Sequence, residues 1–151
     1  MTLVDLKRAI IALLKENFPN HNFYSGARVE AINRPAFFTR LTASSDIPAN
    51  YHTRHANYVL TIDYFQAEGD EVDGLETMQK IRDIFGLYIY VGCGDRDSRI
   101  VYVGEWGYEY IGQSKNVLQG SVNLEWFDRI DHPNNADTME SITVDYKYKE
   151  G

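Results

Sequence analysis

Residues 57–74 read NYVLTIDYFQAEGDEVDG, and this stretch decides the fold because a strand-like half is followed by a helix-like one. In its first half, apolar and polar positions alternate with the period of two that defines a β-strand with two distinct faces. One face carries Tyr58, Leu60, Ile62 and Tyr64, and the other carries Val59, Thr61, Asp63 and Phe65. Four acids then follow within six residues, namely Glu68, Asp70, Glu71 and Asp73.

The acidic cluster suggests two interpretations, a metal site at the end of a strand or the solvated start of a helix. A calcium loop of the EF-hand type requires glycine at its sixth position and glutamate at its twelfth. Counted from Glu68, these positions are Asp73 and Gln79, so the pattern fails. Acids that precede a helix are favoured by the positive end of its dipole. We therefore interpret the cluster as the start of a helix.

The same periodicity predicts the remaining elements and an α+β domain over residues 1–151, with an antiparallel or mixed sheet and two helices on one face. The polar segment 43–54 predicts a long loop, which is a usual place for docking contacts. Residues 130–151 are expected to be extended or mobile, with a weak edge strand over 143–148. Helices are predicted over 2–17 and 73–85, and strands over 22–25, 36–42, 55–65, 87–91, 99–110 and 117–129.

Three details of this prediction bear on packing. Thr2 and Asp5 predict an N-terminal capping box. The second helix is expected to bury a stripe formed by Leu75, Met78, Ile81 and Phe85 and to stop at Gly86. Gly120 interrupts the apolar face of the last long strand, which suggests a bulge there.

Composition narrows the class of protein. The chain has 151 residues, 44% of them apolar, which suffices for one domain with a core. Its formal charge of −7 argues against a nucleic-acid-binding surface. The single cysteine excludes an internal disulfide, and no signal peptide or apolar run of membrane-spanning length is seen. These features predict a soluble protein that is not secreted by a signal peptide.

No catalytic, cofactor or metal site is predicted from the residues. His52 and His55 lack the further ligands of a zinc set, and His21 and His132 stand alone. Cys93 lies in a glycine-flanked turn with no base nearby in the sequence. No nucleophile elbow or phosphate-binding loop is present. We therefore predict that the protein is not an enzyme and has no cofactor.

Charged residues are distributed unevenly along the chain. Basic residues gather around the first strands and the predicted loop, and the acids gather later, so a basic region could meet an acidic region of another copy head to tail. The alternative is that these charges are scattered over the surface as in any soluble protein and mark no contact between copies. The candidate subunit or tube interface comprises Arg28, Arg34, Arg40, Arg54, His52 and His55.

The ordered set of segments resembles the phage tail-terminator (tail completion) proteins of Gram-positive phages and prophages. The resemblance rests on the helix LKRAIIALLKENFPN with the short FYS strand, on RPAFFTRL (34–41) and on YVLTIDYF (58–65), followed by a helix, a hairpin and a long last strand. It covers nearly the whole chain, but the segment 43–54 is idiosyncratic and the part after Asp131 matches only loosely.

This resemblance implies a structural protein of the virion, located at the junction of tail and neck and assembled in the bacterial cytoplasm. It implies a ring, usually of six copies, that caps the head-proximal end of the tail tube, stops its polymerisation and presents the head-joining surface. The implied partners are further copies, the tail tube protein and the head-completion or connector protein, with DNA passing through the lumen without specific binding. Acids expected at the lumen or a subunit boundary are Glu68, Asp70, Glu71, Asp73, Asp95 and Asp97.

Two alternatives stay open. One is another head–tail connector or neck protein of the same size. The other is a small ligand-binding domain or enzyme that uses strands 99–110 and 117–129 as pocket walls. An open sheet face with exposed tyrosines would favour assembly over ligand binding.

Overall fold

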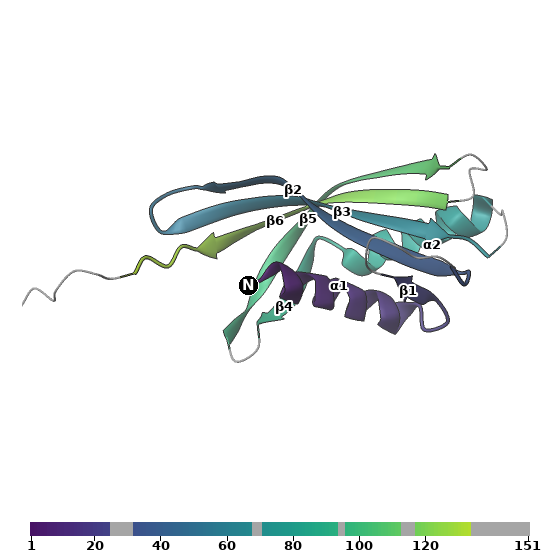
Figure 1. The fold of residues 1–151 in the computed structure, drawn as a ribbon, viewed down its shortest axis with the longest axis horizontal. Helices are drawn as coiled ribbons and strands as arrows, with labels where there is room; N and C mark the ends of the chain where they lie inside the picture. The colour runs from purple at the N-terminus through teal and green to yellow at the C-terminus, as the bar shows by residue number, and fades with distance from the viewer. Residues whose placement is uncertain (25–31, 68–70, 94–95, 113–116, 134–151) are drawn as a thin grey trace, which may run out of the picture.

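The computed structural model describes residues 1–24, 32–67, 71–93, 96–112 and 117–133, with the side chains of 96 and 97 left out. The predicted strand 143–148 and the rest of the predicted tail after residue 133 lie outside the described residues. Figure 1 shows the elements in chain order. They are α1 (Leu3–Asn17), β1 (Asn22–Tyr24), β2 (Ala36–Pro48), β3 (Thr53–Phe65), α2 (Glu71–Phe85), β4 (Tyr88–Cys93), β5 (Arg96–Ile111) and β6 (Val117–Arg129).

The strands form one six-stranded sheet in the order β1-β2-β3-β6-β5-β4. Every neighbouring pair is antiparallel except β1 and β2, which run parallel. The long strands β3 and β6 lie at the centre and pair along their whole lengths, from Thr53 opposite Arg129 to Phe65 opposite Val117. The mixed sheet with two helices confirms the predicted α+β fold.

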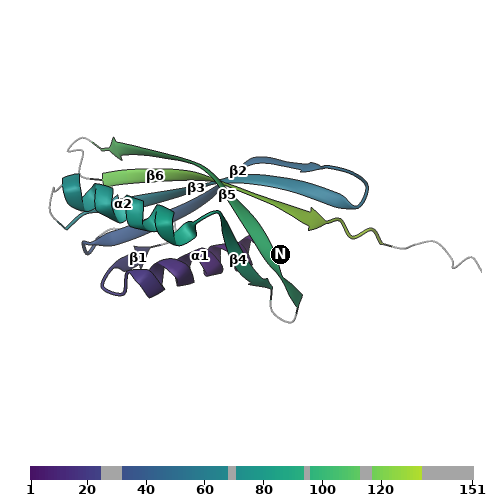
Figure 2. The same cartoon turned by 180° about the vertical axis from the view of Figure 1, so that it is seen from behind.

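Both helices cover the same face of the sheet, as the two opposite views show (Figures 1 and 2). The face of β3 that carries Tyr58, Leu60, Ile62 and Tyr64 is buried. Its cross-strand partners Leu118 and Val122 are buried with it. The Phe37 ring lies 5.1 Å from the Phe18 ring and 5.0 Å from the Tyr64 ring, so the end of α1 packs on this face. The helices contribute Leu6, Ile10 and Leu14 from α1 and Met78, Ile81 and Phe85 from α2.

The helix ends follow their local sequence. Thr2 Oγ1 accepts a hydrogen bond from the Asp5 amide at 3.1 Å, and Asp5 Oδ2 accepts one from the Thr2 amide at 2.9 Å, which confirms the capping box. Helix α2 ends at Gly86, whose φ of 59° is in the left-handed region that glycine adopts without strain. The predicted stripe of α2 is wrong at Leu75, which is 48% exposed. Gly74 and Thr77 lie on the buried side instead.

The predicted loop over 43–54 is wrong. Strand β2 continues to Pro48 and β3 begins at Thr53, so these residues form a long hairpin with a tight turn at 49–52. We call residues 43–57 the arm, and it extends beyond the helices (Figure 1). Every residue from 42 to 52 is exposed, so no burial selects an apolar alternation that would reveal the strand in the sequence.

Strand β5 is bent and serves two neighbours. Its first part pairs with β4. Its pairing with β6 begins at Tyr102 and Val103 and continues from Trp106 to Ile111 after an irregularity between Val103 and Trp106. The bulge expected at Gly120 is therefore in β5 instead, since Gly120 is paired regularly on both sides. Gly120 is explained by a close approach, because a Cβ there would lie 2.9 Å from Met78 Sδ.

Candidate assembly surfaces

The arm carries most of the predicted interface residues that the structure describes. His52 lies in its turn, and Arg54 Nη1 pairs with Asp46 Oδ1 at 2.9 Å across the hairpin. The Tyr58 hydroxyl donates to Asp46 Oδ2 at 3.2 Å, and burial together with this carboxylate raises the pKa of Tyr58. These contacts join β2 to β3 within the arm, whose β3 strand also pairs with β6 from Thr53 to Asn57.

The opposite face of the arm joins it to β6. His55 Nε2 lies 2.8 Å from Glu125 Oε1, and its ring stacks on Phe127 with centroids 4.7 Å apart. Phe127 is 51% exposed, as are Ile47 (55%) and Tyr51 (67%). Large exposed apolar side chains on a protruding element are typical of a surface that contacts another protein.

The predicted arginines do not form one patch. Arg34 Nη1 donates to the Gln66 carbonyl at 3.0 Å, and its guanidinium lies 5.5 Å from the Phe65 ring centroid. Arg34 and Arg54 thus lie at opposite ends of the β2–β3 ladder, with Arg40 between them. Arg28 lies outside the described residues.

The predicted acids have different environments. Glu71 is exposed in the first turn of α2, whereas Asp73 accepts a hydrogen bond from the Tyr64 hydroxyl at 2.7 Å. Burial, reinforced by this carboxylate, raises the pKa of Tyr64 to about 12. Glu68, Asp70 and Asp95 lie outside the described residues, and Asp97 is described only as backbone of β5. A place for any of these acids at a lumen or boundary stays a prediction.

A second exposed surface was not singled out from the sequence. On strands β4 and β5, Tyr88 pairs with Tyr102 and Tyr90 with Ile100, so the four side chains share one face. They are 42–61% exposed, and the Tyr88 and Tyr90 rings lie 5.2 Å apart. A side-chain hydrogen bond between Tyr90 and Tyr88 raises the pKa of Tyr90. The signal was the alternation of tyrosines in YIY and VYV, since a strand with one buried face puts every second residue in solvent.

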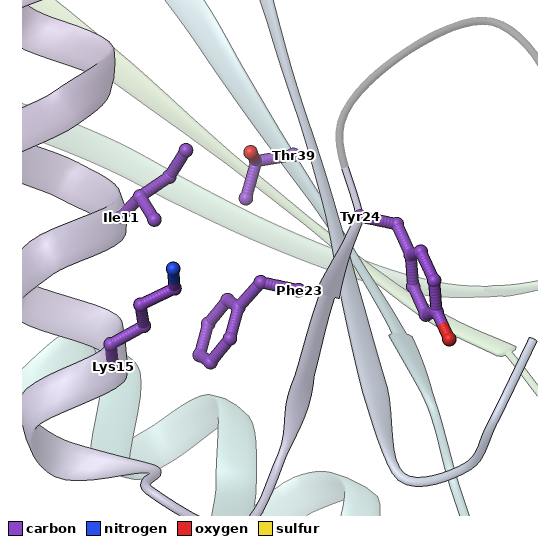
Figure 3. Close-up of a pocket in the computed structure, with 5 residues that line it drawn as sticks. All are labelled: Ile11, Lys15, Phe23, Tyr24 and Thr39. Carbon is purple, nitrogen blue, oxygen red and sulfur yellow. The ribbon is translucent and has the colours of Figure 1, made fainter.

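The described part of the chain also has hollows, and two of them bear on ligand binding. The first, of about 90 Å³, is lined by Ile11, Lys15, Phe23, Tyr24 and Thr39. Figure 3 shows Lys15 reaching from α1 toward Phe23, while Tyr24 points away on the other side of its strand. This volume is far below the roughly 300 Å³ at which ligand pockets begin.

The second hollow is wide and open, of about 740 Å³, between the turn of the arm, the end of β6 and the first part of β5. Its lining is mostly polar and charged and includes Arg99, whose Nε lies 3.7 Å from Asp128 Oδ1. Among the described residues, no group of three or more potential metal ligands comes together. None of the helices in the described part of the chain has the length and apolar character needed to span a membrane.

The geometry therefore consists of a helix-covered core, a protruding arm and an exposed tyrosine face. Comparison with curated proteins yields no match. Comparison with protein families gives a match to the family described as phage tail terminator protein over residues 5–137, which is most of the chain. The family supports a structural role in a phage tail, a place in the virion and contact with tail and head components. The chain belongs to the phage tail terminator family.

Proposed function

We propose that copies of this protein form a ring, of six subunits, that caps the head-proximal end of the tail tube. The ring stops tube polymerisation and presents the surface to which the head connector binds. The observation that carries this proposal is the family match over residues 5–137. The arm supports it, because an extended exposed hairpin with large apolar side chains suits contact with a neighbouring copy or with the tube.

The ring would need no catalytic group, and its lumen would pass DNA. The net charge of −7 suits passage without binding, because an acidic lining repels the phosphate backbone. Of the predicted acids whose side chains the structure describes, Glu71 is exposed and Asp73 is half-buried. Replacement of Glu71 by lysine is expected to slow DNA ejection if Glu71 faces the lumen, and unchanged ejection would remove it from the lining.

Tail length tests the proposal directly. An early stop codon in this gene, within its native phage element, is expected to give overlong or ragged tails that are not joined to heads, as seen by electron microscopy. Supply of the wild-type protein from a plasmid should restore tail length. Tails of normal length beside filled heads would identify a neck or connector protein instead. Intact particles would contradict an assembly role altogether.

A further inference from the structure

The sheet has two margins that carry no partner strand over much of their length within the described residues. Strand β1 pairs only with residues 36–38 of β2, so the rest of β2 has no strand on that side. The β4–β5 ladder closes with the Val103 amide donating to the Leu87 carbonyl at 2.9 Å, so residues 104–111 of β5 have none either. Such edges are templates for another strand.

The backbone of β2 presents its hydrogen-bonding groups to this margin. The Pro35 carbonyl accepts from the Asn22 amide at 3.0 Å, and the Thr39 carbonyl accepts from Lys7 Nζ at 3.2 Å. Because peptide groups alternate in a strand, those of Leu41 and Ala43 point the same way. Lys7 donates to the Thr39 carbonyl. Beyond Thr39, none of the described strands pairs with this margin, and residues 42–48 are all exposed.

Charge distinguishes the two margins. Arg40 is exposed, and its pairing with Thr61 puts it on the face of the sheet opposite the helices. Glu109 is exposed on the same face of β5 through its pairing with Gln119, and Glu105 is exposed nearby. Within the described residues, the side chains of these three make no hydrogen bond or ion pair. Pairing β5 with β5 would oppose glutamates, whereas β2 with β5 opposes unlike charges.

Strand direction agrees with this pairing. Three antiparallel steps lead from β2 through β3 and β6 to β5, so β2 and β5 run in opposite directions within one copy. A rotation that builds a ring can bring the β5 margin of the next copy beside β2 with its direction unchanged. The resulting pair is antiparallel, and Arg40 can lie opposite or diagonal to Glu109 on one face.

We propose that neighbouring copies join by sheet continuation, with the free margin of β2 (residues 40–48) pairing antiparallel with the free margin of β5 (residues 104–111) of the next copy. The inference rests on the proposed ring and specifies its contact. The two stretches are of similar length, nine and eight residues, and lie at opposite sides of the sheet. A contact between two different surfaces is heterologous, which is the kind that closes a ring.

Directed cross-linking tests the contact. In a Cys93→Ser background, Thr42→Cys marks the β2 margin and Gly107→Cys marks the β5 margin, where an added Cβ meets nothing within 4 Å. The single variants are mixed on tails assembled in the stop-codon phage and treated with a short bis-maleimide. We expect cross-linked dimers between the two variants and none from either variant alone. The matched control is Glu76→Cys, exposed on α2, which should cross-link with neither.

Charge exchange tests the same contact by function. Arg40→Glu or Glu109→Arg is expected to lower the fraction of correctly capped tails about tenfold, since like charges then oppose at every contact of the ring. The double variant should restore capping. A double variant no better than the singles, with all three proteins folded by circular dichroism, would contradict the pairing.

The outcomes separate this inference from the proposed function. If cysteine variants cap tails normally but residues 42 and 107 do not cross-link, the ring stands and the sheet continuation is wrong. If loss of the gene leaves tail length normal, the proposed function itself is wrong. Cross-links formed equally by each single variant alone would indicate symmetric pairing and also overturn the inference.

Discussion

The helix-covered half of the sheet and the arm are built from the same two strands, yet different forces hold them. Under the helices, Phe37 and Tyr64 stack within an aromatic cluster with Phe18 and are 0–1% exposed. In the arm, β2 and β3 keep their pairing while every side chain from 42 to 52 is exposed. A strand thus needs no buried face over its whole length when backbone pairing extends it. The exposed part of these strands is then available for contact with other proteins.

The two regions are expected to differ most in the free energy of unfolding that is lost when a large apolar side chain is replaced by alanine. Phe37→Ala should lower the free energy of unfolding by about 3–5 kcal/mol, because it empties a fully buried aromatic site. Ile47→Ala in the arm should change it by less than about 0.5 kcal/mol, because surface substitutions cost little. Urea denaturation of both variants measures the contrast. An equal loss for the two would show that the arm is packed against the domain and would remove the distinction.

A smaller effect is expected at the contact between α2 and the sheet. Gly120→Val adds bulk where a Cβ would already lie 2.9 Å from Met78 Sδ, so α2 or the methionine must shift. Overpacking of this kind costs about 1–3 kcal/mol. Gly107→Val in β5 is the control, since a Cβ there meets nothing within 4 Å. Thermal melting of both variants gives the comparison, and a Gly120→Val protein as stable as wild type would show that Met78 yields freely.

The difference in stability lost on removing either of two tyrosine–aspartate hydrogen bonds, one on each side of the boundary, is expected to be smaller still. Tyr64→Phe removes the bond to Asp73 under the helices, and Tyr58→Phe removes the one to Asp46 at the base of the arm. A hydrogen bond to a charged partner contributes about 1.5–3 kcal/mol when well made. The bonds measure 2.7 Å and 3.2 Å, so we expect the Tyr64 variant to lose more stability in urea titrations. The reverse order would place the stronger constraint in the arm.

The sequence predicted the elements best where burial imposes a period. The alternation in 58–65 and the start of β6 at Val117 are confirmed because one face of these strands is buried. Residues 43–52 of the arm were missed as strands because their side chains are exposed on both faces and carry no periodic signal. The bulge in β5 was misplaced to Gly120, since a glycine marks either a bulge or a close approach and only packing decides which.

Candidate residues were harder to predict than elements. Single charges such as Arg34 and Asp73 carry no sign in the sequence of their local partners, which come from distant segments. The free margins of β2 and β5 exist because the neighbouring strands β1 and β4 are shorter than β2 and β5. The order of strands in the sheet, which the sequence does not show, decides which strands are neighbours. The family resemblance, by contrast, was readable because it rests on the order of elements along the whole chain, and the family match confirms it.

The smallest expected effect is a dependence of stability on pH that arises from a histidine in the helix-covered half. The His21 ring lies 5.1 Å from the Phe37 ring and 5.8 Å from the Tyr64 ring. Burial lowers the pKa of His21, Lys80 lowers it further, and Asp73 opposes them. The unfolded chain therefore binds a proton more readily than the folded one, so stability is complete above the ordinary pKa of 6.5 and falls as the pH drops below it. His21→Gln should flatten the dependence of the urea midpoint on pH between about pH 7 and pH 5. A slope that persists in His21→Gln would assign the proton to another group.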